Sequence, residues 1–199
     1  LGRYSIIGVR SYLKLVKDDH GFFINGQKES ELSFEEYLKK YLSEHKDQNE
    51  SGLPMLSGAV GYFSYEYGRK LMEVPSHKEN LVTIPDAVLV FYDMYIIEDC
   101  HEKKTYLVAN GITEDAEKLI ESVEVRLTEV LIEKEQVADR PFDIEVTPNF
   151  KKEEYKQAVD DMIRYIIEGD IYITNMTQQL EVKSNKKPLD VFYDLRENN

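Results

Sequence analysis

Residues 87–92, Ala-Val-Leu-Val-Phe-Tyr, place the strongest constraint on the fold, because they are apolar without interruption. A short run rich in β-branched and aromatic residues is typical of a strand that is covered on both faces. We therefore expect a buried strand here, with other elements packed around it.

Alternating patterns predict further strands. Tyr4–Val9 and Tyr12–Val16 each alternate, and residues 21–26 fit a hairpin-like return. Residues 58–65 form a strand whose glycines allow other backbone to approach closely. Two strands at 95–97 and 105–109 flank a polar stretch and predict a hairpin.

Four helices are expected from capping signals and from apolar spacing of 3.6 residues. Ser33 with Glu36 forms a capping box before the first. A second helix starts near Thr113 and carries an apolar stripe that extends to Val130 and Leu131. A third follows Pro148 and stops at Gly169, and a fourth, short helix opens at Pro188. Residues 171–182 between these last two return to a strand pattern. The fold class predicted is α+β, with mostly antiparallel β-sheets packed with helices.

The polar stretch 136–147, which contains a proline, predicts a linker. We expect one domain at residues 1–140 and the start of a second at residues 141–199. The first residues have neither a Met nor a signal-peptide pattern. The sequence therefore reads as a piece cut from within a longer protein.

Composition excludes several classes of function. The formal net charge of −13 argues against nucleic acid and anionic membrane surfaces, which require clustered Lys and Arg. The apolar runs fall short of the roughly 20 residues of a membrane span. A single cysteine, Cys100, rules out an intrachain disulfide and fits the cytoplasm.

Three segments together carry a resemblance: Gly2–Gly8, the glycine-rich strand Gly58–Arg69, and Gly169–Gln178. They are similar, in order and separation, to segments of the component I family shared by anthranilate synthase and aminodeoxychorismate synthase. The third is close to the pattern Gly-Asp-x-Tyr-Gln-Val-Asn-Leu-(Thr/Ala)-Gln that opens the family's chorismate-binding domain. The resemblance covers nearly the whole chain and implies the N-terminal region of the component I fold.

Asn175 and the segment Ile84–Asp93 look more like the aminodeoxychorismate branch of that family than the anthranilate branch. There are also departures. Ile173 and Thr174 replace the family's usual Gln-Val pair, which puts fine substrate contacts in doubt. The family's catalytic Glu, nucleophilic Lys and acidic Mg²⁺ ligands correspond to positions beyond Asn199, so we expect no catalytic and no metal-binding residue in this chain.

For a longer parent protein, the resemblance implies chorismate as substrate, Mg²⁺ as cofactor and a glutamine amidotransferase subunit that supplies ammonia. A Lys would displace the ring hydroxyl, and ammonia would then displace the Lys to give 4-amino-4-deoxychorismate for folate synthesis. Two alternatives stay open: anthranilate synthase component I, and a regulatory module that binds an amino acid and docks the glutaminase without chemistry.

The resemblance also implies site residues. Gly2, Arg3 and Tyr4 align with the wall of a tryptophan effector pocket, where an Arg beside an aromatic ring can stack on indole or pair with a carboxylate. The competing interpretation makes Arg3 a surface strand residue and Tyr4 a core residue. Asn175 and Gln178 lie on the expected strand of the substrate domain, on opposite faces, so only one can face substrate. We favour a structural role for both. The four histidines fall in expected loops without metal-ligand spacing.

Overall fold

The computed structural model describes residues 2–46, 48–76, 83–129 and 145–198. The chain divides into two compact units, residues 1–132 and 133–199, which are described separately. The domain boundary expected at residues 140 and 141 lies outside the described residues, as do Val130 and Leu131 of the expected helical stripe.

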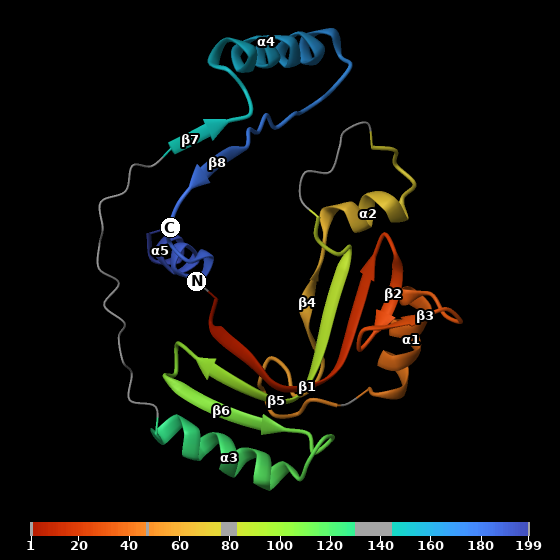
Figure 1. The fold of residues 1–199 in the computed structure, drawn as a ribbon, viewed down its shortest axis with the longest axis vertical. Coiled ribbons are helices and arrows are strands. Elements are labelled where there is room, and N and C mark those ends of the chain that lie inside the picture. Colours follow the sequence, from red (N-terminus) through yellow and green to blue (C-terminus); the bar gives the residue numbers. More distant parts are fainter. Residues whose placement is uncertain (1, 47, 77–82, 130–144, 199) are drawn as a thin grey trace. The chain divides into compact units, whose positions relative to one another are not determined.

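The first unit is built on one antiparallel sheet (Figure 1). Its strands are β1 (Tyr4–Asp18), β2 (Gly21–Ile24), β3 (Gln27–Glu29), β4 (Ala59–Phe63), β5 (Ala87–Asp99) and β6 (Lys104–Ala109). The order is β3-β2-β1-β5-β4, and β6 also pairs with β5. The first half of β5 pairs with β4 and the second half with β6, while β1 pairs along nearly its whole length.

The run expected to be a buried strand is therefore the centre of the sheet. It continues further than predicted, because residues 87–92 and 95–97 belong to the same strand. The two strands expected at the start of the chain are likewise one strand, β1, with an irregular register between Ser11 and Leu13.

Three helices accompany this sheet: α1 (Phe34–Glu44), α2 (Tyr65–Leu71) and α3 (Ala116–Glu129). The capping box is confirmed, since Ser33 Oγ accepts from Glu36 N (3.2 Å) and Glu36 accepts from Ser33 N (2.9 Å). Helix α1 contributes Phe34 to a core that includes Leu89 and Phe91 of β5, and α3 contributes Leu119 to a second core that includes Met94.

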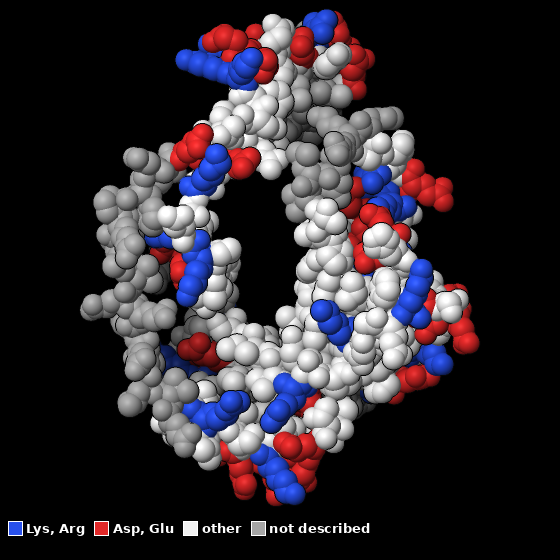
Figure 2. Space-filling model, viewed as in Figure 1, with Lys and Arg blue, Asp and Glu red and all other residues white. Residues whose placement is uncertain are grey.

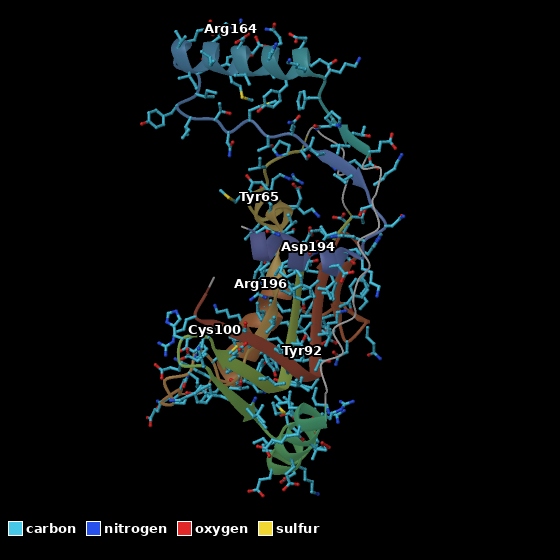
Figure 3. All side chains as sticks on the ribbon, turned by 90° about the vertical axis from the view of Figure 1, so that its left-hand side faces the viewer. Tyr65, Tyr92, Cys100, Arg164, Asp194 and Arg196 are labelled. Atoms are coloured by element: carbon cyan, nitrogen blue, oxygen red, sulfur yellow. The ribbon has the colours of Figure 1, made fainter. Side chains whose placement is uncertain are left out.

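Helix α2 was not predicted, because Gly68 interrupts the helical pattern in a segment that was assigned to the glycine-rich strand. Ser64 caps it by accepting from Tyr67 N (3.1 Å). Glu66 lies in its first turn and Arg69 in its last, which suits the helix dipole. Tyr65, at its first residue, is 90% exposed (Figure 3).

The second unit contains β7 (Glu145–Pro148), α4 (Lys152–Glu168), β8 (Leu180–Lys183) and α5 (Pro188–Asn198). Gly169 ends α4 in the left-handed region (φ 85°), as predicted. The strand expected over residues 171–182 is wrong except at β8. In this stretch the strand begins only at residue 180, where β8 pairs with β7, and residues 171–179 form no ladder with any described strand.

The architecture confirms the α+β class. None of the helices in the described ranges has both the length and the apolar character needed to cross a bilayer. On the face drawn in Figure 2, Lys and Arg side chains are interspersed with Asp and Glu. That distribution agrees with the charge argument against a nucleic-acid surface.

Candidate functional site

Arg3 is held at the start of β1 by the opposite strand. Its Nε and Nη2 lie 3.0 and 2.6 Å from Asp99 Oδ2, and its carbonyl oxygen accepts from Cys100 N (2.9 Å). The guanidinium carbon also lies 4.9 Å from the centre of the Tyr4 ring. The structure therefore brings Arg3 and Tyr4 together, with the exposed Cys100 next to them on the β5–β6 turn (Figure 3).

Asp99 is the buried member of this pair, with 2% of its surface exposed. The ion pair with Arg3, followed by hydrogen bonds from the backbone N–H groups of Glu102 and His101, lowers the pKa of Asp99 to about 2. Two nitrogens of Arg3 are thus engaged inside the protein. The half-exposed remainder of its guanidinium and the Tyr4 ring are the groups that could face an effector.

Gly2 contributes little to such a wall. A Cβ built on it would meet nothing within 4 Å among the described residues. Of the three expected effector residues, Arg3 and Tyr4 form one cluster with Asp99, and Gly2 lies exposed beside it.

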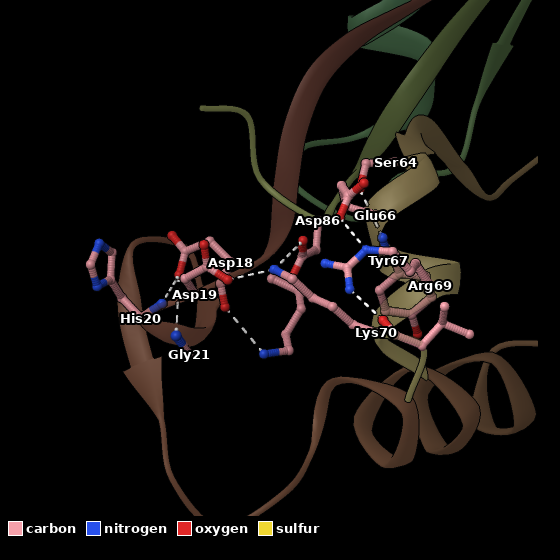
Figure 4. Close-up of polar contacts among 12 residues, drawn as sticks. Asp18, Asp19, His20, Gly21, Ser64, Glu66, Tyr67, Arg69, Lys70 and Asp86 are labelled. Atoms are coloured by element: carbon pink, nitrogen blue, oxygen red, sulfur yellow. Dashed lines mark hydrogen bonds and ion pairs between the residues drawn. The ribbon is translucent and has the colours of Figure 1, made fainter. Parts of the chain in front are cut away.

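A second polar cluster involves the glycine-rich segment that carried the resemblance (Figure 4). Lys70 of α2 places its Nζ 2.8 and 3.0 Å from the two carboxylate oxygens of Asp86, and it also contacts Asp19 in the β1–β2 turn. Asp86 is 5% exposed, so its charge needs this partner. Ser64 N donates to the carbonyl oxygen of Asp86 (2.7 Å). These contacts tie α2 to two strands of the sheet, which is a structural role.

The expected substrate-domain residues lie in the second unit. Asn175 and Gln178 are both exposed and fall in residues 171–179, which are not a strand, so their assignment to opposite strand faces is wrong. Gln178 lines a hollow of about 480 Å³ together with Phe150 and Tyr155. Asn175 makes no side-chain hydrogen bond to another described residue.

No group of three His, Cys, Asp or Glu side chains within the described ranges is arranged to hold a metal ion. His77 lies outside the described residues, and His20 and His101 are exposed loop residues. His45 is likewise exposed, directly after the end of α1, and its ring stacks on that of Tyr41.

The comparison with protein families decides the assignment. The profile of the family described as chorismate binding enzyme matches residues 3–199. The chain belongs to the chorismate-binding enzyme family. The match spans both units of this family member and includes all the candidate residues except Gly2.

Two relatives from different organisms are subunits of anthranilate synthase. Anthranilate synthase component 1 from Acetivibrio thermocellus is 28% identical, over 98% of this chain and 43% of its own length. The chloroplastic anthranilate synthase alpha subunit 2 of Arabidopsis thaliana is 26% identical over 98% of this chain and 36% of its own. The chain thus spans less than half the length of these relatives.

The fold of this chain is also found in a solved structure. The crystal structure of anthranilate synthase component I from Streptococcus pneumoniae TIGR4 superposes with a TM-score of 0.80 at 21% identity. The superposition covers 100% of this chain and 46% of that one.

Sequence reasoning missed a hollow of about 540 Å³ in the first unit, lined by Tyr12, Tyr41 and His45 among others. The signal was present in the pattern Tyr-x-x-x-Tyr-x-x-x-His at 37, 41 and 45, which places three aromatic rings on one side of a helix.

Proposed function

We propose that this chain is the N-terminal part of a component I-type subunit that aminates chorismate. The observation that carries the proposal is the family match over residues 3–199, a range that includes the segment Gly169–Gln178. The names of the curated relatives and the fold of the Streptococcus pneumoniae protein support the same reaction class. In this proposal the first unit is a supporting β domain, and the second begins the chorismate-binding part.

The catalytic residues in this proposal lie outside the chain. The family's Lys or its equivalent, the catalytic Glu and the Mg²⁺ ligands would come from the rest of a longer protein, together with ammonia from a glutamine amidotransferase subunit. Residues 1–199 alone are then inactive. The single cysteine, free and exposed at Cys100, supports a cytoplasmic location.

Two products distinguish the two branches. Asn175 and the segment Ile84–Asp93 favour 4-amino-4-deoxychorismate, which keeps the enolpyruvyl group of chorismate. The names of the relatives favour anthranilate, whose formation releases pyruvate. Both candidates share the amination step and differ in whether elimination follows.

The test uses the complete gene product that contains this chain, incubated with chorismate, ammonium and Mg²⁺. Chorismate is followed by its absorbance, pyruvate by coupling to lactate dehydrogenase, and anthranilate by its fluorescence. Chorismate loss without pyruvate identifies the aminodeoxychorismate branch, and one pyruvate per chorismate identifies the anthranilate branch. No chorismate loss by the complete protein, with or without its glutaminase, would refute the proposal. Turnover by residues 1–199 alone would refute the placement of the catalytic groups.

A further inference from the structure

The hollow between the end of α1 and the sheet has the size of a small-molecule site. Its volume of about 540 Å³ lies within the range of roughly 300–1,000 Å³ that is usual for ligand pockets. Residues from β1, α1, β5 and the loops before β4 and after β6 line it. We propose that this pocket binds a small planar aromatic carboxylate, with its ring against the aromatic side chains and its carboxylate at Lys46.

The backbone of β1 is distorted so as to present Tyr12 to this pocket. Ser11 pairs with Tyr92 and Leu13 with Phe91, which leaves Tyr12 as an extra residue in the strand. Arg10 takes a left-handed φ of 58°, a conformation that costs a non-glycine residue roughly 1 kcal/mol or more. Bulges of this kind redirect side chains and are frequent beside binding sites. As a result, Tyr12 and its neighbour Leu13 both pack on the side of the sheet that α1 covers.

Tyr41 is the centre of the aromatic wall. Its ring stacks on His45 (centroids 4.1 Å apart, planes at 16°) and meets Phe91 edge-on at 4.8 Å. Its hydroxyl lies 2.9 Å from that of Tyr12. His45 Nδ1 lies 2.9 Å from the carbonyl oxygen of Tyr41, and because a carbonyl oxygen only accepts, that nitrogen carries the proton. These contacts fix the rings, and fixed rings favour a flat aromatic ligand over a bulky aliphatic one.

The interior offers two polar groups for a substituent on such a ring. In the Tyr12–Tyr41 pair, one hydroxyl donates to the other and the second keeps a hydrogen to donate. Asn110 lines the pocket, and its Nδ2 donates to the carbonyl oxygens of Leu56 (3.3 Å) and Asp93 (3.2 Å). Its amide oxygen is the group left to accept. A ring hydroxyl or amino group can use both.

The loop that carries Asn110 is itself held in place. Asp93 is fully buried and accepts from Ile112 N (2.8 Å) and from the backbone and hydroxyl of Thr113. The wall of the pocket formed by residues 110–112 is therefore set before any ligand binds, which lowers the ordering cost of binding.

The rim of the pocket carries one side chain of each charge, Lys46 and Glu44. Lys46, an exposed residue that lines the pocket, offers an ammonium group to a carboxylate. Glu44 also lines the rim, so a dianion is disfavoured and one carboxylate is the better fit. This site goes beyond the proposed chorismate chemistry and stands or falls separately from it.

The test titrates residues 1–199 with 4-hydroxybenzoate and follows amide shifts in ¹⁵N–¹H spectra. We expect saturable shifts confined to the lining residues. Cyclohexanecarboxylate, which has the charge without the flat ring, and phenol, which lacks the carboxylate, should each bind at least about fivefold more weakly, a difference of roughly 1 kcal/mol.

Lys46→Gln should weaken 4-hydroxybenzoate binding about fivefold. Lys39→Gln, an exposed substitution on α1 outside the pocket, is the matched control and should change it less than about twofold. Tyr41→Leu should abolish binding. If that variant does not fold, Tyr12→Phe tests the same wall, because it keeps the ring and removes only the hydroxyl. Its expected loss is about threefold, since one hydroxyl is removed.

Four outcomes would overturn the proposal. The first is no saturation of the shifts when 4-hydroxybenzoate is raised to roughly 10 mM, a range that includes weak millimolar binding. The others are equally tight binding of cyclohexanecarboxylate, equal losses of affinity in the Lys46 and Lys39 variants, and tighter binding of L-phenylalanine, which would show that the pocket takes a zwitterion.

Discussion

Replacing Gly61 with alanine would place a methyl group where β5 already has backbone. A Cβ built on Gly61 would lie 1.8 Å from the carbonyl oxygen of Val88 and 3.0 Å from the Cα of Leu89. Ordinary contact begins at 3.4 Å, so β4 would have to separate from β5. No side-chain rotation can relieve the clash, because the obstructing atoms belong to the central strand.

Overpacking a well-filled site costs typically about 1–3 kcal/mol. Separation of β4 from β5 would also weaken ladder hydrogen bonds that contribute about 1 kcal/mol each. We therefore expect Gly61→Ala to lower the free energy of unfolding by roughly 3 kcal/mol. At about 3 °C per kcal/mol for a chain of this size, the Tm should fall by about 10 °C. Circular dichroism during heating and during urea titration measures both quantities.

Gly68→Ala is the matched control, since it makes the same chemical change in the same unit. Nothing lies within 4 Å of a Cβ at Gly68, and the residue is inside helix α2. Alanine is favoured over glycine in a helix by up to about 1 kcal/mol, so this variant should be more stable than the parent. A loss below about 1 kcal/mol for Gly61→Ala, which overpacking normally exceeds, would refute the close approach of β4 to β5.

Three further predictions concern charge, exchange and the effector. The folded pKa of Asp99, about 2, lies below its ordinary value of 3.8, so its contribution to stability is complete above that ordinary value and is lost as the pH falls through 2. Asp99→Asn should therefore make the free energy of unfolding less dependent on pH between those two values. An unchanged pH dependence, measured by urea titration, would contradict the ion pair. Backbone amides at 172–178 have no backbone partner within the described residues. Their hydrogens should therefore exchange with solvent at least about 100-fold faster than those of amides within α4, as measured by mass spectrometry. Equal protection would show that this segment is paired, as in an oligomer. Tryptophan should bind residues 1–199 more weakly than about 1 mM, because Asp99 already engages Arg3. In the complete protein, Arg3→Ala should weaken tryptophan binding and leave chorismate turnover nearly intact; loss of turnover would remove the regulatory assignment. The ligand's indole fluorescence reports binding, since the chain contains no Trp.

Local signals in the sequence were sufficient where the physics is local. The capping box at Ser33 and the left-handed Gly169 each depend on residues within one or two turns, and both occur as predicted. The uninterrupted apolar run from Ala87 identified the central strand, because only a strand covered on both faces tolerates such a run.

Features that depend on distant partners could not be predicted. Residues 171–179 have a strand-like composition but no partner strand within the described part of the chain. Helix α2 is stabilised by Lys70 reaching Asp86, sixteen residues away, which no periodicity reveals. The cluster of Arg3 with Asp99 joins residues 96 positions apart, so the resemblance could point to Arg3 and could not supply its partner.

Strand β5 is shared by two hydrophobic cores on opposite faces of the sheet. Ala87, Leu89 and Phe91 face the core under α1, whereas Met94 and Ile96 face the core under α3, because alternate residues point to opposite sides. Neither core can be complete while this strand is unfolded. The first unit should consequently unfold in a single cooperative transition. A substitution that leaves a cavity at Leu119 should therefore also lower the hydrogen-exchange protection of α1, on the other side of the sheet.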